Sequence, residues 1–497
     1  MGEMRFQIPR PEQLPDDAFR WAYMAGLEGI PVRSVNRMSG STLIVDRDID
    51  ESGNLFIPWR VAGRDPLVLS TASLMERDEP YLLPVEIARG TLNRLRHQIH
   101  AWRSAERELE SELQASADRA MQLFIEAATT QRDIDRAAEL AGEAIDLAVA
   151  TLEGVMTLTA ADAIERRHQR ETRLPTMMAV NVGCTELTAA ETQGVLAAFN
   201  SAAVPVVWRR AEPNAGEFDW QTLDAQIEWC REVGLRVCGG PILRLDKGFL
   251  PDWLYLWEDD FEQIEACVAS FVEAVVTRYH GKMHAWHCAA RLNTDAALAL
   301  EEEDMIRLAA TVIQTARHAD SKTPLIVSFD QPWGEYLARE DRDLSPLHFA
   351  DALVRADLGI AGLGVEINLG YSPGGTLRRE MLDLSQQLDR WLYFGLPLLV
   401  MLTIPSSRRP DEQAARQAWP IDADQEVGSD EEARRYADYL ERVAQMLLAK
   451  TGVHGVIWDQ LHDATKHEFA HGGLFDEQHQ PKAALSKLIE LRRRHLV

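Results

Sequence analysis

After Leu174-Pro175, short apolar runs alternate with amphipathic stretches of helical period to the end of the chain. Strands that alternate with helices in this way predict βαβ units and a parallel sheet. Eight such units in roughly 320 residues fit an α/β fold, the closed (β/α)8 TIM barrel, in which functional side chains stand at the carboxyl ends of the strands. The predicted strands are 177–182, 204–209, 235–240, 283–288, 325–329, 360–367, 398–403 and 456–459.

Polar and aromatic side chains at the predicted strand ends are the candidates for a functional site. Glu366 with Asp330 or Asp459 could form a catalytic acid/base pair of unequal pKa. In the alternative, Glu366 forms a buried ion network with Arg291 or Arg209. The candidates for ligand contacts are Trp208, Arg209, His287, Arg291, Asn293, Asn368, Trp458 and His462.

Two features refine this picture of the site. An unpaired guanidinium at the end of a buried strand would carry a large desolvation penalty, so Arg291 is predicted to lie beside a carboxylate, with Glu366 as the first choice. A polar loop follows the eighth strand, and loops of this kind usually line the cleft of a barrel. The loop contains His462, Lys466, His467, Glu468 and His471.

The first 90 residues contain short β-rich runs separated by Gly, Asp and Asn, which predict a small antiparallel β domain. Its aromatic side chains either fill a small core or form a platform on which sugars stack, as in a carbohydrate-binding module. These side chains are Trp21, Tyr23, Phe56, Trp59 and Tyr81.

Residues 91–173 change to a helical period with no Pro and little Gly, and a break near 128–133 predicts two long helices folded as a hairpin. The hairpin would brace the β domain against the barrel or pair with a second copy to give a homo-oligomer. The expected domains are therefore residues 1–90, 91–173 and 174–497.

Charge and composition narrow the range of partners. A net charge of −26 argues against nucleic acid and anionic membranes, and favours a neutral or cationic ligand. No basic-then-apolar leader and no run of about 18 apolar residues is seen, so neither a secretory signal nor a membrane span is expected. The five cysteines stand singly, which suits free thiols and a cytoplasmic location. The histidines and acids lack the local spacing of a metal site, so neither metal nor cofactor is predicted.

Several motifs, in order, resemble glycoside hydrolase family 10, the xylanase family. Trp208-Arg-Arg-Ala-Glu212-Pro213-Asn-Ala-Gly216-Glu-Phe218-Asp219-Trp220 is similar to the motif after the family's second strand. Leu250-Pro-Asp-Trp253 resembles the family's third loop, and Gly473-Leu-Phe-Asp476 with Pro481-Lys482-Ala483 its closing segment. The resemblance covers about residues 176–490. It implies the TIM barrel, a poly- or oligosaccharide ligand and, if the protein is an enzyme, an O-glycosyl hydrolase of the endo-β-1,4-xylanase type.

The resemblance fails at the catalytic positions. Retaining hydrolysis in this family needs two facing carboxylates, a proton donor and a nucleophile. By the same alignment, Arg291 stands at the donor position and Leu402 at the nucleophile position. The resemblance therefore implies a carbohydrate-binding barrel that lacks the usual mechanism or uses the relocated carboxylates Glu366, Asp330 and Asp459. The alternative is a non-catalytic assembly or scaffold protein that works through the helical hairpin and the β domain.

Overall fold

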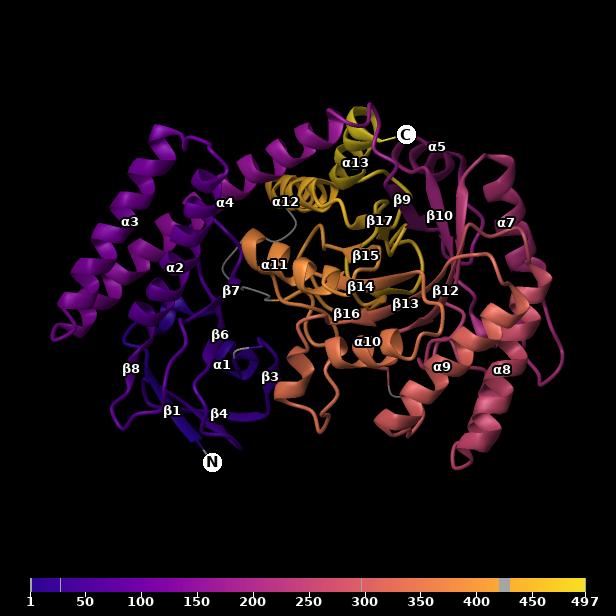
Figure 1. The fold of residues 1–497 in the computed structure, drawn as a ribbon, viewed down its shortest axis with the longest axis horizontal. Coiled ribbons are helices and arrows are strands. Elements are labelled where there is room, and N and C mark those ends of the chain that lie inside the picture. Colours follow the sequence, from indigo (N-terminus) through magenta and orange to yellow (C-terminus); the bar gives the residue numbers. More distant parts are fainter. Residues whose placement is uncertain (1, 27, 296, 420–429, 497) are drawn as a thin grey trace. The chain divides into compact units, whose positions relative to one another are not determined.

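The structure is a computed structural model that describes residues 2–26, 28–295, 297–419 and 430–496. The chain forms two compact units, each made of three segments of sequence (Figure 1). The N-terminal unit comprises residues 1–165, 333–343 and 377–388. The barrel unit comprises residues 166–332, 344–376 and 389–497.

The barrel unit is built on eight parallel strands that close on themselves, because the last strand pairs with the first. The prediction of a (β/α)8 barrel is therefore confirmed. Small and aliphatic side chains such as Ala203, Ile326 and Met401 fill its interior. In barrel order the strands are β9 (Met177–Asn181), β10 (Ser201–Val204), β11 (Arg236–Gly239), β12 (Ala285–Ala290), β13 (Leu325–Asp330), β14 (Gly362–Asn368), β15 (Leu398–Thr403) and β17 (Val453–Trp458).

Helices follow the barrel strands, and several have clear start signals. Thr188 and Glu191 form a capping box at the start of α5, and Asp260 caps α8 by accepting from the backbone N–H of Gln263. In the barrel unit the helices are α5 (Ala189–Ala198), α6 (Trp208–Ala211), α7 (Gln221–Glu232), α8 (Phe261–Arg278), α9 (Glu302–Ala319), α10 (Pro346–Arg355), α12 (Asp430–Ala449) and α13 (Ala483–His495), with a 3-10 turn at η2 (Asp252–Trp257). The 3-10 turn η3 (Glu335–Ala338) and the start of α11 (Met381–Leu392) belong to the segments 333–343 and 377–388 of the N-terminal unit.

The second strand differs from its prediction. It was expected at 204–209, but β10 spans Ser201–Val204 and the chain enters α6 at Trp208. Pro205 has no N–H to donate to a ladder, so the strand ends before it. The small residues Ala202 and Ala203 give a weak β signal although they form the strand. As a result Trp208 and Arg209 lie in a helix beyond the strand end.

The N-terminal unit contains two four-stranded sheets, ordered β4-β5-β1-β8 and β3-β2-β6-β7, in which every pair except β1 with β8 is antiparallel. The predicted β region is thus present. The strands are β1 (Gly2–Gln7), β2 (Tyr23–Ala25), β3 (Pro31–Val32), β4 (Ser34–Ser39), β5 (Thr42–Arg47), β6 (Asn54–Trp59), β7 (Leu67–Ser70) and β8 (Tyr81–Leu82), with η1 (Pro11–Gln13) and α1 (Ala18–Trp21) between them.

The helical region holds three helices, α2 (Leu83–Ser104), α3 (Ser111–Thr129) and α4 (Ile134–His168), so the predicted two-helix hairpin is wrong. Residues 81–87 belong to the region predicted to be β-rich, yet most of them are helical. Pro84 sits in the first turn of α2, where its missing N–H does no harm. The chain turns between α2 and α3 at Glu106, whose φ is 58°. By length and composition α4 could cross a membrane, yet half of its most apolar stretch is buried within the protein.

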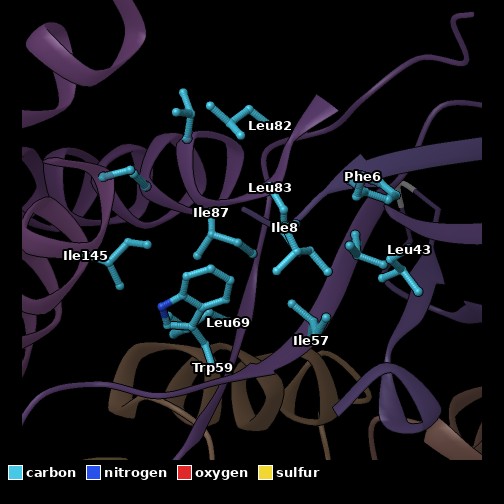
Figure 2. Packing of buried hydrophobic residues seen from close by; sticks show 14 of the residues in the cluster. Phe6, Ile8, Leu43, Ile57, Trp59, Leu69, Leu82, Leu83, Ile87 and Ile145 are labelled. Carbon is cyan, nitrogen blue, oxygen red and sulfur yellow. The ribbon is translucent and has the colours of Figure 1, made fainter. Parts of the chain in front are cut away.

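Two aromatic residues of the β region, Tyr23 and Trp59, are buried in the N-terminal unit. Figure 2 shows Trp59 of β6 among Leu69, Ile87 and Ile145, which belong to one buried cluster. Trp59 is 1% exposed, and Tyr23 is buried and stacked on Phe56 with ring centres 4.9 Å apart. The burial of Trp59 and Tyr23 matches the interpretation of these two as core residues, since a sugar-stacking platform needs exposed ring faces. Trp21, Phe56 and Tyr81 are only partly buried.

Candidate functional site

A small cavity of about 40 Å³ opens at the carboxyl ends of the barrel strands. This is room for about one or two water molecules and is too small to enclose a sugar ring. Charged side chains from several different strands face it. The lining includes Asn181, Pro205, Gly240, Arg244, Phe249, His287, Arg291, Glu366 and Asp459.

Arg291 is the central side chain of this site. It follows β12 directly and is 1% exposed, and it pairs with Glu366 through Nε, with Glu468 through Nη1 and with Asp459 through Nη2 at 3.1 Å. The predicted pairing with Glu366 is therefore confirmed. Burial alone would lower the pKa of Arg291, but the carboxylates, Glu366 foremost, raise it well above its usual value. The guanidinium stays charged at any physiological pH.

The backbone of Arg291 is as unusual as its side chain. Its φ is 58°, in the left-handed region that non-glycine residues rarely adopt. The Arg291 carbonyl accepts from the N–H groups of Thr294 at 2.9 Å and Asp295 at 2.8 Å. Arg291 follows this turn with its side chain in the cavity lining, and an unfavourable conformation of this kind persists only where surrounding contacts hold it.

Glu366 lies at the floor of the site on β14 and is 3% exposed. Besides Arg291, it accepts a hydrogen bond of 2.8 Å from Ser328 Oγ, which in turn contacts His287 Nε2 at 2.8 Å. Because Ser328 gives its one hydroxyl proton to Glu366, His287 must donate from Nε2. Burial lowers the pKa of His287 to about 4, so this ring is neutral at neutral pH. Burial acts to raise the pKa of Glu366, but Arg291 and Arg244 outweigh it and keep Glu366 ionised.

Asp459 directly follows β17, and its pKa is shifted in the opposite direction from that of Glu366. It accepts from Arg291 Nη2 and, at 3.4 Å, from Asn181 Nδ2. Burial raises its pKa from 3.8 to about 6, against the opposing effect of Arg291. Two carboxyl groups bound to one guanidinium therefore differ in charge state near pH 6, with Glu366 ionised and Asp459 partly protonated.

Glu468 completes the site from the loop after β17. It lies in a two-stranded sheet formed by β16 (Ala414–Arg416) and β18 (His467–Phe469). Its carboxylate accepts from Arg291 and from Arg244 at 3.0 and 3.2 Å, and forms an ion pair with Arg416 Nη2 at 3.1 Å. Burial acts to raise the pKa of Glu468, but the three arginines lower it below its usual range.

Arg244, Arg416 and Glu468 were absent from the site predicted from the sequence, although Glu468 had been assigned to the polar loop. A signal for Arg244 exists, since it follows the third strand by a few residues, but nothing in its local sequence indicates which carboxylates it meets. In the structure Arg244 also pairs with Asp295 at 3.3 Å. Burial raises the pKa of Asp295 to about 6.

Asp330 and Asn293 are hydrogen-bonded to each other next to the turn at Arg291. The Asn293 amide donates to the Asp330 carbonyl at 2.8 Å and accepts from the Asp330 N–H at 3.1 Å. The Asp330 carboxyl is fully buried, accepts from Thr294 Oγ1 at 3.3 Å and lies 3.6 Å from Arg416, and burial raises its pKa. These contacts fix the turn that carries Arg291, and both residues lie outside the cavity lining.

The remaining predicted site residues also lie outside that lining. Trp208 is 1% exposed, stacks on Phe271 with ring centres 4.6 Å apart, and donates to Glu212 at 2.7 Å. Arg209 pairs with Asp252. Trp458 is buried and donates to the Gly472 carbonyl at 3.1 Å.

His462 and Asn368 are the last two of the predicted site residues. His462 lies 3.5 Å from Thr185 Oγ1, and its ring centre is 5.5 Å from that of His479. The Asn368 amide is fully buried and has no hydrogen-bond partner in the part of the chain that the structure describes. Among the described residues, no three His, Cys, Asp or Glu side chains are grouped to hold a metal ion.

Part of the barrel unit is similar to a known protein family and to solved structures. Residues 174–308 match the family model "Glycosyl hydrolase family 10", a span that includes Arg291. Similar solved structures include a GH10 xylanase of Thermobacillus composti (16% identity, 64% of this chain and 96% of that chain covered, TM-score 0.48). A second is native xylanase 10B of Thermotoga maritima (15% identity, 67% of this chain and 97% of that chain covered, TM-score 0.48). A third is GH10 of Paenibacillus barcinonensis (17% identity, 68% of this chain and 98% of that chain covered, TM-score 0.49). The resemblance of the barrel to glycosyl hydrolase family 10, predicted from the motifs, is confirmed by the family match to residues 174–308.

Proposed function

We propose that the barrel binds a poly- or oligosaccharide of the xylan type and does not hydrolyse it by the usual retaining mechanism. One observation carries the proposal: a permanently charged guanidinium, Arg291, stands at the end of β12, where the family resemblance calls for a proton donor. Retaining hydrolysis needs a protonated carboxyl group there and a carboxylate nucleophile opposite. At the position matching the nucleophile, the side chain is Leu402, which is 1% exposed.

The size of the cavity supports binding over its mouth. About 40 Å³ admits water but no sugar ring, so the saccharide would lie across the strand ends and contact the polar groups from above. Arg244 and Asp459 line the cavity and offer a donor and an acceptor to sugar hydroxyls.

The test combines binding with turnover on one preparation of the full chain. Calorimetric titration with xylohexaose is expected to give saturable binding, while incubation with xylan releases no reducing sugar above the protein-free control. Arg291→Met should keep hydrolysis absent, because removing the cation does not supply an acid. Release of reducing sugar at rates typical of enzymes would overturn the proposal, and absence of binding to any saccharide would favour the scaffold alternative.

A second candidate is a hydrolase with relocated carboxylates, and the unequal pKa values of Glu366 and Asp459 favour it. A raised pKa suits Asp459 as the acid, and a lowered pKa suits Glu366 as the anion. The protein would then be an O-glycosyl hydrolase of the xylanase type. In that case hydrolysis of an aryl xyloside should fall above about pH 6 and be lost in both Asp459→Asn and Glu366→Gln.

A further inference from the structure

Three arginines of the barrel unit converge on one carboxylate. Arg244 and Arg291 are 8% and 1% exposed, and Arg416 has a side chain that is 19% exposed. All three bind Glu468, whose side chain is 24% exposed and so lies between the buried guanidiniums and solvent. Arg244, Arg291 and Arg416 are called the arginine triad below.

Each member of the triad has an acidic partner other than Glu468. Arg291 keeps Glu366 and Asp459, Arg244 keeps Asp295 at 3.3 Å, and Arg416 lies 3.6 Å from Asp330. Removing the Glu468 carboxylate would therefore leave no bare buried cation. Arg416 Nη1 is buried and has no hydrogen-bond acceptor among the described residues, and the Asp330 carboxyl lies 3.6 Å from it.

We propose, on the basis of the function proposed above, that the arginine triad is a binding position for a ligand carboxylate, which Glu468 occupies in the absence of ligand. The saccharide bound by the barrel would then carry a carboxylate, as a uronic acid does. Planar guanidinium groups match carboxylates in geometry and charge better than any other side chain. Arg244 and Arg291 also line the cavity, so a sugar bearing this carboxylate would lie over the cavity mouth.

The net charge of −26 sets a limit on the ligand. Repulsion from distant surface charges is screened beyond about 10 Å at ordinary salt, whereas the triad acts at contact distance. A neutral chain with occasional uronate groups therefore fits better than a continuous polyuronate, on which every residue would be repelled.

Glu468 is suited to leave and return. Its neighbour Phe469 is 1% exposed and anchors the strand, but successive strand residues face opposite sides, so the Glu468 side chain can rotate into solvent while Phe469 stays in place. Because Glu468 is tethered, it competes as if present at roughly millimolar concentration or above. A free monosaccharide acid should therefore bind the native protein weakly, and loss of Glu468 should expose the affinity of the triad.

The experiment measures calorimetric binding of D-glucuronate, D-glucose and glucose 6-phosphate to the full chain and to Glu468→Ala. Glucuronate should bind Glu468→Ala at least about tenfold more tightly than the native protein, which is a gain of about 1.4 kcal/mol. Glucose should show no gain. If glucose 6-phosphate gains as much as glucuronate, the triad is a general anion site and the assignment to a carboxylate is overturned.

Matched variants separate the triad from loosening of the loop. Asp411→Asn removes the negative charge that lies 3.0 Å from His467 of the same small sheet but keeps Glu468, and it should show no gain in glucuronate affinity. Arg416→Met added to Glu468→Ala should abolish the gain. If Glu468→Ala does not fold, Glu468→Gln removes the charge at nearly constant volume, and no gain in either variant overturns the inference.

Failure of this inference can be told apart from failure of the proposed function. Native protein that binds neutral xylohexaose, with no glucuronate gain in the variants, would leave the proposed function standing and end this inference. In the reverse result, Glu468→Ala binds glucuronate more tightly than the native protein does, but the native protein does not bind xylohexaose. That result would support the carboxylate site at the arginine triad and contradict the proposal of a xylan-type ligand.

Discussion

Arg291 donates from Nε to Glu366 with both side chains withdrawn from solvent, 1% and 3% exposed. Two buried charges held together in this way gain little net stability, because the attraction largely offsets the cost of removing them from water. The loss of one partner is a different matter, since it leaves the other charge buried without its main compensation. The pair therefore fixes the arrangement of the site more than it stabilises the fold.

The first prediction is a double-mutant cycle on this pair. Arg291→Met and Glu366→Gln should each destabilise the protein by about 3 kcal/mol, and the double variant should be destabilised by clearly less than the sum. Unfolding in guanidinium chloride, followed by tryptophan fluorescence, gives the four free energies. Additive effects would show that the two residues are not coupled and would release Glu366 for a catalytic role.

The second prediction concerns pH and Asp459. Its folded-state pKa, about 6, lies above the unfolded value near 3.8, so the folded protein binds the proton more tightly. The stability it contributes is complete below about pH 4 and is lost as the pH rises to 6. Asp459→Asn, which cannot ionise, should therefore gain about 2 kcal/mol of unfolding free energy relative to the native protein between pH 4.5 and 7.5. Parallel stability profiles for the two proteins would contradict the raised pKa.

Much of the barrel and the central ion pair could be predicted from the sequence, for a physical reason. The strands are apolar runs whose neighbours along the chain are also neighbours in the sheet, so order alone places Arg291 and Glu366 at the same end of the barrel. A buried guanidinium then requires a carboxylate within reach. The strand that was misplaced, β10, is formed by small residues before a proline and carries little β signal.

The convergence of Arg244 and Arg416 on Glu468 could not be predicted, because these residues lie in segments that follow different barrel strands. Arg244, Arg416 and Glu468 lie far apart in sequence, and the length of a loop does not tell which other loop it meets. The turn at Ala105 and Glu106 was missed for a different reason. The residues from 105 to 110 are good helix formers with no Gly or Pro, and packing of α2 against α3 overrides that propensity.

The third prediction tests the role of Trp59 in the N-terminal unit. Trp59→Ala should cost about 3–5 kcal/mol, because a large side chain leaves a cavity in a closely packed core. Trp257, which is 42% exposed, is the matched control, and Trp257→Ala should change stability by about 0.5 kcal/mol or less. Thermal unfolding measures both variants. A small effect at Trp59 together with weakened xylohexaose binding would restore the sugar-platform interpretation.

The last prediction concerns a second buried arginine, Arg379, in the N-terminal unit. It is fully buried, pairs with Glu335 and with Asp383 at 2.8 Å, and donates to the Tyr23 hydroxyl at 2.7 Å. These contacts link the segments 333–343 and 377–388 to β2. Arg379→Met should cost about 3–5 kcal/mol, since it leaves Glu335 as a buried charge without its cation, whereas Tyr23→Phe should cost about 1.5 kcal/mol, because Arg379 keeps both carboxylates.

An exposed ion pair of the same unit provides the control for Arg379. Arg33 and Asp341 have side chains that are 57% and 89% exposed, so Arg33→Met should change the free energy of unfolding by less than about 1 kcal/mol. In denaturant unfolding, the loss of unfolding free energy should be largest for Arg379→Met, smaller for Tyr23→Phe and smallest for Arg33→Met. Limited proteolysis should cut segments 333–343 and 377–388 fastest in Arg379→Met. Equal costs for Arg379→Met and Arg33→Met would show that the buried arginine does not hold these segments.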